Sequence, residues 1–352
     1  MEIKEAIAEA KVICMQKFIN RLLLAIFSLP TFIFGHSSFE DADVHVYYDH
    51  DEANFAVPPP QLPSHEDAMM LFVSGSYTLW RPYQQGMALL YTVSDQASPT
   101  NWIYPRMNYQ SGFKVALGVN TFHDGWKVEA EYTWFYNHPK ANTPKLNLAQ
   151  VQYYAFWIDN VVTDATTDFS SRFANSFNRI DLTVDRAFYA GNYFTFAPWI
   201  GLVSAWENQT FYQEILTNVP DYFEFNQTQN WWGIGPYLGA DCTYYFLDYF
   251  GIFLTGGGSL NLCEHKVSQY RTKDSQIDVN TSLQLWNVEP MADLMIGLRF
   301  NSYGMDFGMQ IEAGWQLQVW FEHNGFILYP ITPNFFGNYS MQGLTATLRL
   351  NF

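Results

Sequence analysis

Histidines close to carboxylates are the side chains of this chain best suited to acid–base chemistry. His138, His265 and His323 each fall near the end of a predicted strand. Their neighbours in the sequence include Glu264, Ser268, Asp274 and Glu322. A hydrolase needs a nucleophile, a base and an orienting carboxylate that converge in space. No GxSxG, HExxH, Walker or CxxC pattern joins these residues. We therefore expect surface histidines, no catalytic residue and no cofactor, and a membrane hydrolase stays only as an alternative.

A second set of charged residues alternates with apolar ones along predicted strands. Its cations are Lys114, Lys127, Arg179, Arg299 and Arg349. Its carboxylates are Glu129, Glu131, Asp181, Asp185, Asp241, Glu289, Asp293 and Glu312. Carboxylates that surround an aqueous channel attract cations and repel anions. The set therefore predicts a pore lining with a weak preference for cations. The open alternative is that opposite charges on adjacent strands form salt-bridged ladders that only keep the interior wet.

The strands that carry these charges have one apolar and one polar face. In "GFKVALGVNTFHDGWKVEAEYTW", residues 112–134, two halves alternate with a period of two around a five-residue turn. Phe113, Val115 and Leu117 fall on one face, and Lys114 and Gly118 fall on the other. In a soluble protein a second sheet or a layer of helices would cover the apolar face. Strands of more than ten residues recur too often here for an ordinary soluble sandwich.

Ten such strands follow one another. They are predicted at 71–80, 109–120, 126–137, 176–189, 193–206, 230–246, 251–263, 283–300, 307–320 and 339–352. The connections between them alternate between short and long, which is typical of a transmembrane barrel with tight periplasmic turns and extended extracellular loops. An even number of antiparallel strands closes without an edge and leaves lipid to cover the apolar face. The prediction is an all-β fold, a transmembrane antiparallel β-barrel. Segments 85–93 and 150–158 also resemble strands, so 12 or 14 strands stay open.

The first 68 residues differ from the barrel region. Lys17 and Arg21 precede an apolar stretch at 22–34 and the small residues Gly35 and Ser37, which predicts a signal peptide over 1–37 with Met15 as an alternative start. A membrane anchor is the competing interpretation. Residues 38–68 read as an acidic, Pro-containing linker, and 69–352 as the barrel. His45, Asp49, His50 and Asp51 could ligate a metal, but a solvated linker is the favoured interpretation and no metal site is predicted.

Composition narrows the function further. Aromatic residues make up 18% and charged residues 15% of the chain, and 18 Lys+Arg against 34 Asp+Glu give a net charge of -16. A nucleic-acid binder needs clustered cations, so that class is disfavoured. Pairing about a turn at 247–250 places Cys242 opposite roughly residue 255, far from Cys263. We expect two free thiols; an intermolecular disulfide is the alternative.

Two features concern the surroundings of the barrel and its interior. Aromatic residues near predicted strand ends suit membrane interfaces; they are Tyr109, Trp126, Tyr136, Trp206, Tyr244 and Phe352. The connection 138–175 contains "VQYYAFWIDN", which is too apolar for a simple solvated loop. We predict that it folds into the barrel as a constriction. An extra hairpin or a subunit contact in a homo-oligomer are the alternatives.

The last strand, "SMQGLTATLRLNF", ends on Phe352 and resembles the assembly signal of bacterial outer-membrane barrels. The blocks "YTLWRPYQQGM", "RIDLTVDRAF", "FTFAPWIGLVSAWENQ" and "WWGIGPYLGAD", with the hairpin quoted above, resemble the major-outer-membrane-protein-like pore-forming family of Legionella and chlamydia-related bacteria from about residue 71 to 352. The resemblance implies an outer-membrane porin for passive diffusion of ions and small hydrophilic solutes, with outer-membrane lipid and the barrel-assembly machinery as partners. A plugged structural or adhesin barrel is the alternative. Chlamydial relatives are cysteine-rich, which this chain is not.

Overall fold

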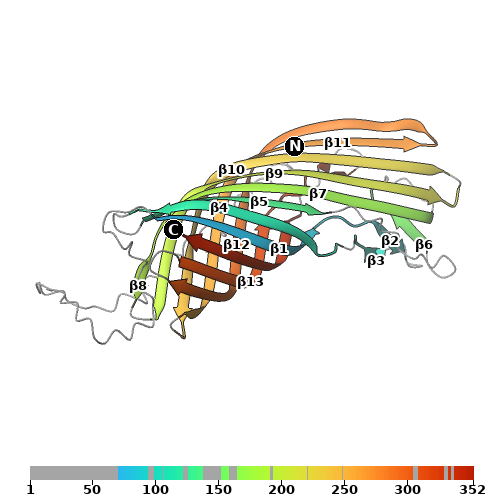
Figure 1. Cartoon of the computed structure of the whole chain (residues 1–352). Coiled ribbons are helices and arrows are strands. Elements are labelled where there is room, and N and C mark those ends of the chain that lie inside the picture. Colours follow the sequence, from blue (N-terminus) through green and yellow to red (C-terminus); the bar gives the residue numbers. More distant parts are fainter. Residues whose placement is uncertain are drawn as a thin grey trace, which may run out of the picture. The chain divides into compact units, whose positions relative to one another are not determined.

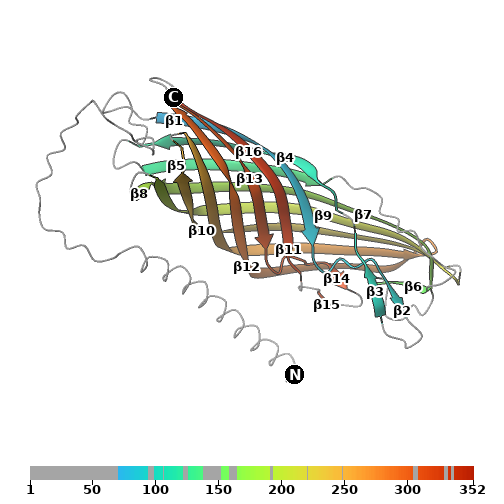
Figure 2. The same ribbon diagram turned by 90° about the horizontal axis from the view of Figure 1, so that it is seen from below.

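The computed structural model describes residues 70–93, 99–105, 107–121, 126–137, 152–157, 165–190, 193–219, 221–247, 249–303, 308–328, 332–333 and 337–352. Ten long antiparallel strands form one closed ring (Figures 1 and 2). They are β1 (Met70–Gln84), β4 (Gln110–Asn120), β5 (Trp126–Asn137), β7 (Thr166–Arg186), β9 (Phe194–Thr217), β10 (Tyr222–Tyr245), β11 (Phe250–Lys273), β12 (Gln276–Tyr303), β13 (Gly308–Trp320) and β16 (Tyr339–Asn351). The predicted ten-strand barrel is confirmed. The predicted signal peptide, linker, acidic metal ligands and His138 lie outside the described residues.

The ring closes where its first and last strands pair. β1 pairs with β16 from Phe72 opposite Asn351 to Gln84 opposite Tyr339, and its other edge pairs with β4. Because every ring strand has a partner on both sides, the ring has no edge strand. Residues 276–290 of β12 pair only with β11, and residues 166–174 of β7 pair only with β9, so the long strands continue past the closed ring as an open sheet. In the part of the chain that the structure describes, no helix is long and apolar enough to cross a membrane.

The outer face of the ring carries exposed apolar side chains between two aromatic bands. Leu117 is 66% exposed and Ile200 is 61% exposed. One band lies at the end of the ring that carries the connections at 121–125, 187–193, 246–249 and 304–307, which we call the turn end. Its exposed rings include those of Trp126, Tyr189, Tyr244 and Phe352. The other band includes the pairs Tyr109–Trp315 and Trp232–Trp286. An exposed apolar face of this kind contacts the lipid of a membrane.

Four strands are much longer than the sequence pattern predicts. β9, β10, β11 and β12 have 24, 24, 24 and 28 residues and continue far past β13 and β16 (Figure 1). The predicted long loops at 207–229 and 264–282 are therefore mostly strand. The period of two persists there, but the faces exchange roles: on β9, Phe211 and Ile215 point inward and are buried, whereas Thr210 and Asn208 face outward. We call this end of the ring the loop end.

Short strands line the loop end. β2 (Leu90–Val93), β3 (Pro99–Ile103) and β6 (Gln152–Ala155) form a separate three-stranded sheet. The strand-like segments 85–93 and 150–158 thus belong to loops, and the ring formed by the described residues has ten strands. β14 (Ile327–Leu328) and β15 (Thr332–Pro333) pair with each other, and β8 (Phe188–Ala190) pairs with the start of β9 at the turn end.

Candidate functional site: the interior of the barrel

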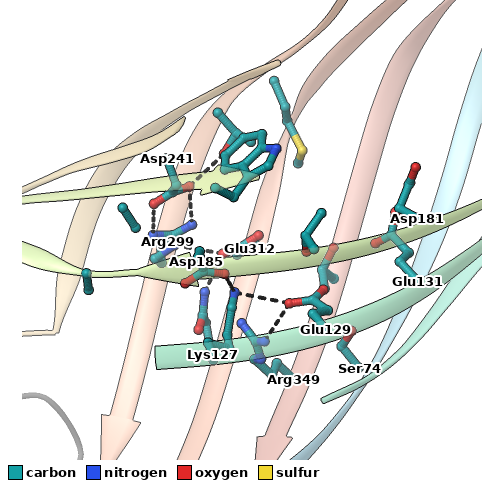
Figure 3. Close-up of a pocket in the computed structure, with 18 of the residues that line it drawn as sticks. Ser74, Lys127, Glu129, Glu131, Asp181, Asp185, Asp241, Arg299, Glu312 and Arg349 are labelled. Carbon is teal, nitrogen blue, oxygen red and sulfur yellow. Dashed lines mark hydrogen bonds and ion pairs between the residues drawn. The ribbon is translucent and has the colours of Figure 1, made fainter. Parts of the chain in front are cut away.

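A polar cavity of about 780 Å³ occupies the turn-end half of the ring (Figure 3). We call it the vestibule. Twelve of the thirteen charged residues predicted to line a pore line this cavity. They are Lys114, Lys127, Glu129, Glu131, Arg179, Asp181, Asp185, Asp241, Asp293, Arg299, Glu312 and Arg349. The strict alternation of the strands brings these residues together, since every second residue of a wall strand faces inward.

The cations of the vestibule are bound by carboxylates. The guanidinium of Arg299 donates to both oxygens of Asp241 at 2.8 Å and to Glu312 at 2.7 Å. The ammonium of Lys127 lies between Glu129 at 3.1 Å and Asp185 at 2.9 Å. Figure 3 shows these two groups on facing parts of the wall. Opposite charges on the wall thus form ion pairs, as the salt-bridged alternative predicts.

Other pairs connect strands that are not neighbours. Arg349 on β16 donates to Glu129 on β5 at 2.9 Å, although β1 and β4 separate these strands in the ring. Arg179 on β7 donates to Asp293 on β12 at 3.0 Å, and to Asp181 on its own strand at 2.8 Å. These pairs reach across the lumen between strands that are not neighbours. They therefore narrow the cavity and also neutralise the charges of its walls.

The net charge of the vestibule is close to zero. One further cation, Arg186, lines the cavity, and its guanidinium lies over the rings of Trp126 and Phe188 at 5.9 and 5.4 Å. Arg186 falls among the alternate positions of β7 that face outward, so the sequence pattern did not place it in the pore lining. Six cations therefore face seven carboxylates (6 − 7 = −1), whereas the sequence set counted five against eight. Glu289 is the predicted residue that does not line the cavity.

A layer of large side chains closes the vestibule on the side of the loop end. We call it the septum, and nine of the ten ring strands contribute to it. Its buried members are Trp80, Phe135, Phe177, Val203, Ala205, Trp231, Tyr237, Cys263, Met291, Trp320, Tyr339 and Met341. Trp231 packs edge-on against Trp320 with ring centroids 5.0 Å apart. The septum makes the middle of the barrel resemble a protein core more than a wide channel.

Next to the septum lies a fully buried charged cluster. His323 contacts Glu289 at 3.1 Å through Nδ1 and Glu207 through Nε2, and His265 contacts Glu289 through Nε2. All four side chains are 0% exposed. The expectation of surface histidines is wrong for His265 and His323, because both side chains are buried. The hydrolase alternative, which placed them near an accessible rim with Ser268, is not supported either, because Ser268 bonds Thr228 instead.

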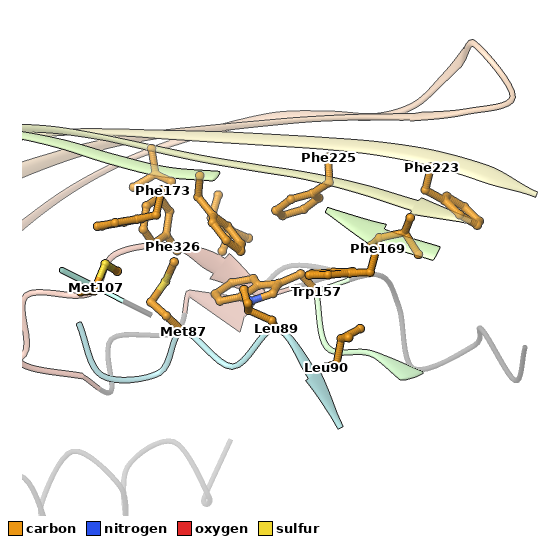
Figure 4. Close-up of a cluster of buried hydrophobic side chains, with 14 residues drawn as sticks. Met87, Leu89, Leu90, Met107, Trp157, Phe169, Phe173, Phe223, Phe225 and Phe326 are labelled. Atoms are coloured by element: carbon orange, nitrogen blue, oxygen red, sulfur yellow. The ribbon is translucent and has the colours of Figure 1, made fainter. Parts of the chain in front are cut away.

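Beyond the closed part of the ring, apolar side chains of β7, β9, β10 and β11 pack against apolar residues of the loops (Figure 4). We call this cluster the loop-end core. It consists of Met87, Leu89, Leu90, Met107, Trp157, Phe169, Phe173, Phe211, Ile215, Phe223, Phe225, Val267, Phe326 and Ile327. Trp157 is 0% exposed, and its Nε1 donates to the Ala88 carbonyl at 2.7 Å. Of the connection predicted at 138–175, residues 166–175 belong to wall strand β7, and Gln152–Ala155 form β6 of the separate three-stranded sheet. Trp157 alone of the described residues 152–157 is a buried member of the loop-end core, and a constriction of the lumen by this connection stays a prediction.

Beyond the core, the tips of the two tall hairpins are joined to each other. Lys273 and Asp221 form an ion pair at 2.7 Å, and the Tyr222 amide donates to the Asp274 carboxylate at 3.0 Å. The hydrogen bond to Asp221 raises the pKa of the Lys273 ammonium. Because water solvates both side chains at the tips, this pair contributes little to the stability of the barrel.

The other candidate ligands give no site in the described residues. The structure there holds no group of three or more His, Cys, Asp or Glu side chains that could bind a metal. Cys242 and Cys263 are free, as expected, and Cys242 lies opposite Leu254. A free Cys263 thiol is buried within the septum.

A closed antiparallel ring with an apolar, aromatic-banded exterior and a charged interior defines a transmembrane β-barrel of the outer-membrane type. The family comparison gives the particular group. The chain belongs to the Legionella outer membrane protein family, because the family model described as the Legionella pneumophila major outer membrane protein precursor matches residues 63–352. The protein is thus a bacterial outer-membrane protein.

Solved structures of outer-membrane proteins resemble the fold at low identity. The outer membrane protease OmpT of Escherichia coli shares 11% identity with a TM-score of 0.45, over 80% of this chain and 96% of that one. A major outer membrane protein of Thermus thermophilus shares 11% with a TM-score of 0.33, over 81% and 100%. The Pseudomonas putida toluene transporter TodX shares 10% with a TM-score of 0.31, over 83% and 92%. Similarity at this level says nothing about activity. No curated protein matches the sequence.

Proposed function

We propose that this protein is an outer-membrane porin for passive diffusion of ions and small hydrophilic solutes. The observation that carries the proposal is the vestibule, a cavity of about 780 Å³ with charged walls inside a transmembrane ring. Charged and polar walls stabilise ions and hydrated solutes that the lipid outside excludes. Family membership supports the same function. The turn end would then face the periplasm and the loop end the cell exterior, as in other barrels with this alternation of connections.

The proposed porin prefers cations weakly. Seven carboxylates against six cations leave one excess negative charge in the vestibule. Since Arg299 and Lys127 are paired with carboxylates, little free charge of either sign remains to repel an ion of like sign. A small preference for potassium over chloride follows.

A plugged structural barrel is the second candidate, and two observations favour it. All named members of the septum and of the loop-end core are buried. The septum lies across the ring, and the loop-end core packs against the long strands beyond it. In such a barrel the vestibule would be a blind pocket. An enzyme is not proposed, since His265 and His323 are buried and bound to carboxylates.

Planar-bilayer recording separates the two candidates. The purified, detergent-solubilised protein is added to a bilayer in a KCl gradient. A porin gives stepwise conductance and a reversal potential displaced slightly toward the potassium equilibrium potential. Silence in repeated insertions that immunodetection confirms would reject the porin and support the plugged barrel. A reversal potential on the chloride side would reject the predicted selectivity while leaving the porin intact.

A further inference from the structure

The start of the connection between β13 and β16 lies inside the ring. This stretch, residues 321–328, is called the plug segment. His323, Asn324 and Phe326 are 0% exposed, and Ile327 is 3% exposed. Connecting loops normally run over the surface, because their backbone polar groups need water. A buried connection therefore requires specific partners, and this segment has them.

Two inward-facing glutamines of β10 bind the backbone of the plug segment. Gln229 accepts from the Gly325 amide at 2.9 Å and donates to the His323 carbonyl at 3.1 Å. Gln227 accepts from the Ile327 amide at 3.0 Å and donates to the Ile327 carbonyl at 2.6 Å. These four bonds replace the water that an exposed loop would use.

His323 holds the segment by charge. Both of its ring nitrogens face carboxylates, Glu289 on β12 and Glu207 on β9. A ring that donates from both nitrogens is an imidazolium, so a buried cation bridges two buried anions on different strands. Glu207 and Glu289 are buried, so each would be left without its positive partner if the plug segment moved away. The ion pairs therefore hold the segment in place. His265 on β11 would remain as the neighbouring titratable group of Glu289.

The same segment connects the septum with the loop-end core. The ring of His323 lies against septum rings, with centroids 4.7 Å from Trp231 and 5.5 Å from Tyr339. Three residues further on, Phe326 packs edge-on against Trp157 in the loop-end core at 6.3 Å. If the plug segment moved, the septum would lose its contacts with His323 and the loop-end core would lose its contact with Phe326.

We propose that the plug segment is a gate, latched in the lumen by the His323 bridge to Glu207 and Glu289, and that its release opens the route between the vestibule and the loop end. The proposal rests on the porin function above, whose regulation it describes. Along β9 the vestibule residue Trp199, the septum residue Val203, the latch residue Glu207 and the core residue Phe211 follow in that order. The latch thus lies where a gate must act, between the two halves of the interior.

Two variants release the segment in different ways. Glu207→Gln with Glu289→Gln removes the anions of the latch and keeps the side-chain shapes. Gln227→Ala with Gln229→Ala removes the backbone clamps and leaves the charges. Glu214→Gln is the matched control, because Glu214 lies on β9, faces outward and accepts from Tyr212 at 2.9 Å. Heat-modifiable gel mobility shows first which proteins have folded barrels.

The native Cys263 thiol reports on the gate without any need for conduction. It is 0% exposed within the septum, so a charged, membrane-impermeant maleimide reaches it only if the interior opens. Cys242 is replaced by Ser in all proteins to leave one thiol. We expect both release variants to raise the rate of Cys263 labelling by about tenfold or more. The glutamate variant removes the buried charge partners of His323, and the glutamine variant removes four hydrogen bonds to the backbone of the segment. Glu214→Gln should label like the parent protein.

Bilayer recording of the same proteins then tests the consequence. Release variants should be open for a larger fraction of time, or show larger steps, than the parent. Folded release variants that label and conduct like a conducting parent would overturn the gate and leave the porin in place. Faster labelling with no conductance in any protein would retain the movable plug segment and reject the porin. If no folded variant is labelled and none conducts, both proposals are rejected.

Discussion

Replacing Arg299 by Gln tests whether the charge pairs of the vestibule stabilise the barrel. Its guanidinium bonds Asp241 twice at 2.8 Å and Glu312 once at 2.7 Å, and lies 4.9 Å from the ring of Phe253. Side-chain exposures of 13–20% keep these groups poorly solvated. Removing one member of a buried pair costs about 3–5 kcal/mol because a carboxylate is left without its partner. These groups border a cavity, so we expect the lower end, about 3 kcal/mol.

Urea unfolding in lipid vesicles, followed by tryptophan fluorescence, measures this loss. The triple variant Arg299→Gln, Asp241→Asn, Glu312→Gln removes all three charges and should recover most of the stability, because no carboxylate is then left unpaired. The reasoning fails if the single variant lies within about 0.5 kcal/mol of the parent, the scatter of ordinary surface substitutions. It also fails if the triple variant is no more stable than the single one. In a conducting barrel the single variant also changes the vestibule charge from −1 to −2, which should move the reversal potential further toward potassium.

Three further substitutions probe other parts of the barrel. Trp157→Ala should cost about 3–5 kcal/mol in the same unfolding assay, since it empties the centre of the loop-end core; a loss below about 1 kcal/mol would mean that this core is not needed for stability. Gly343→Ala should cost more than about 1 kcal/mol, because its φ is 157° and an added Cβ would lie 2.1 Å from the Leu79 carbonyl oxygen; Gly75→Ala, with nothing within 4 Å, is the near-neutral control. Phe352→Ser should lower the amount of heat-modifiable barrel in the outer membrane if Phe352 is the assembly signal, whereas unchanged levels would remove that role.

The membrane half of the fold could be predicted because one physical rule governs it. Lipid demands apolar side chains outside and a wet lumen permits polar ones inside, so period-two alternation reports directly on the wall. The strand predicted at 126–137 is β5 (Trp126–Asn137), and the turn near 247–250 aligns Cys242 with Leu254. The same alternation of inward and outward residues identified twelve of the charged residues that line the vestibule.

The loop-end half could not be predicted by that rule, because water replaces lipid outside. Outward residues of β10 such as Asn226 and Thr228 are polar there, while inward Phe223 and Phe225 are buried. A prediction that looks for strands with apolar outward residues therefore ends each strand where the outward residues become polar. What would have revealed it is the continued alternation itself, with its sign reversed, over 207–229 and 264–282.

Contacts between distant segments also escaped prediction, and they change the electrostatics of the interior. Nothing local marks His323 as buried; its position follows from Gln227 and Gln229, about a hundred residues earlier. Glu289 lies outside the vestibule, in contact with His323 and His265, whereas Arg186 lines the vestibule. An apparent excess of three negative charges thus becomes one. In the proposed porin, ion preference therefore depends less on how many carboxylates face inward than on which of them a cation has already neutralised.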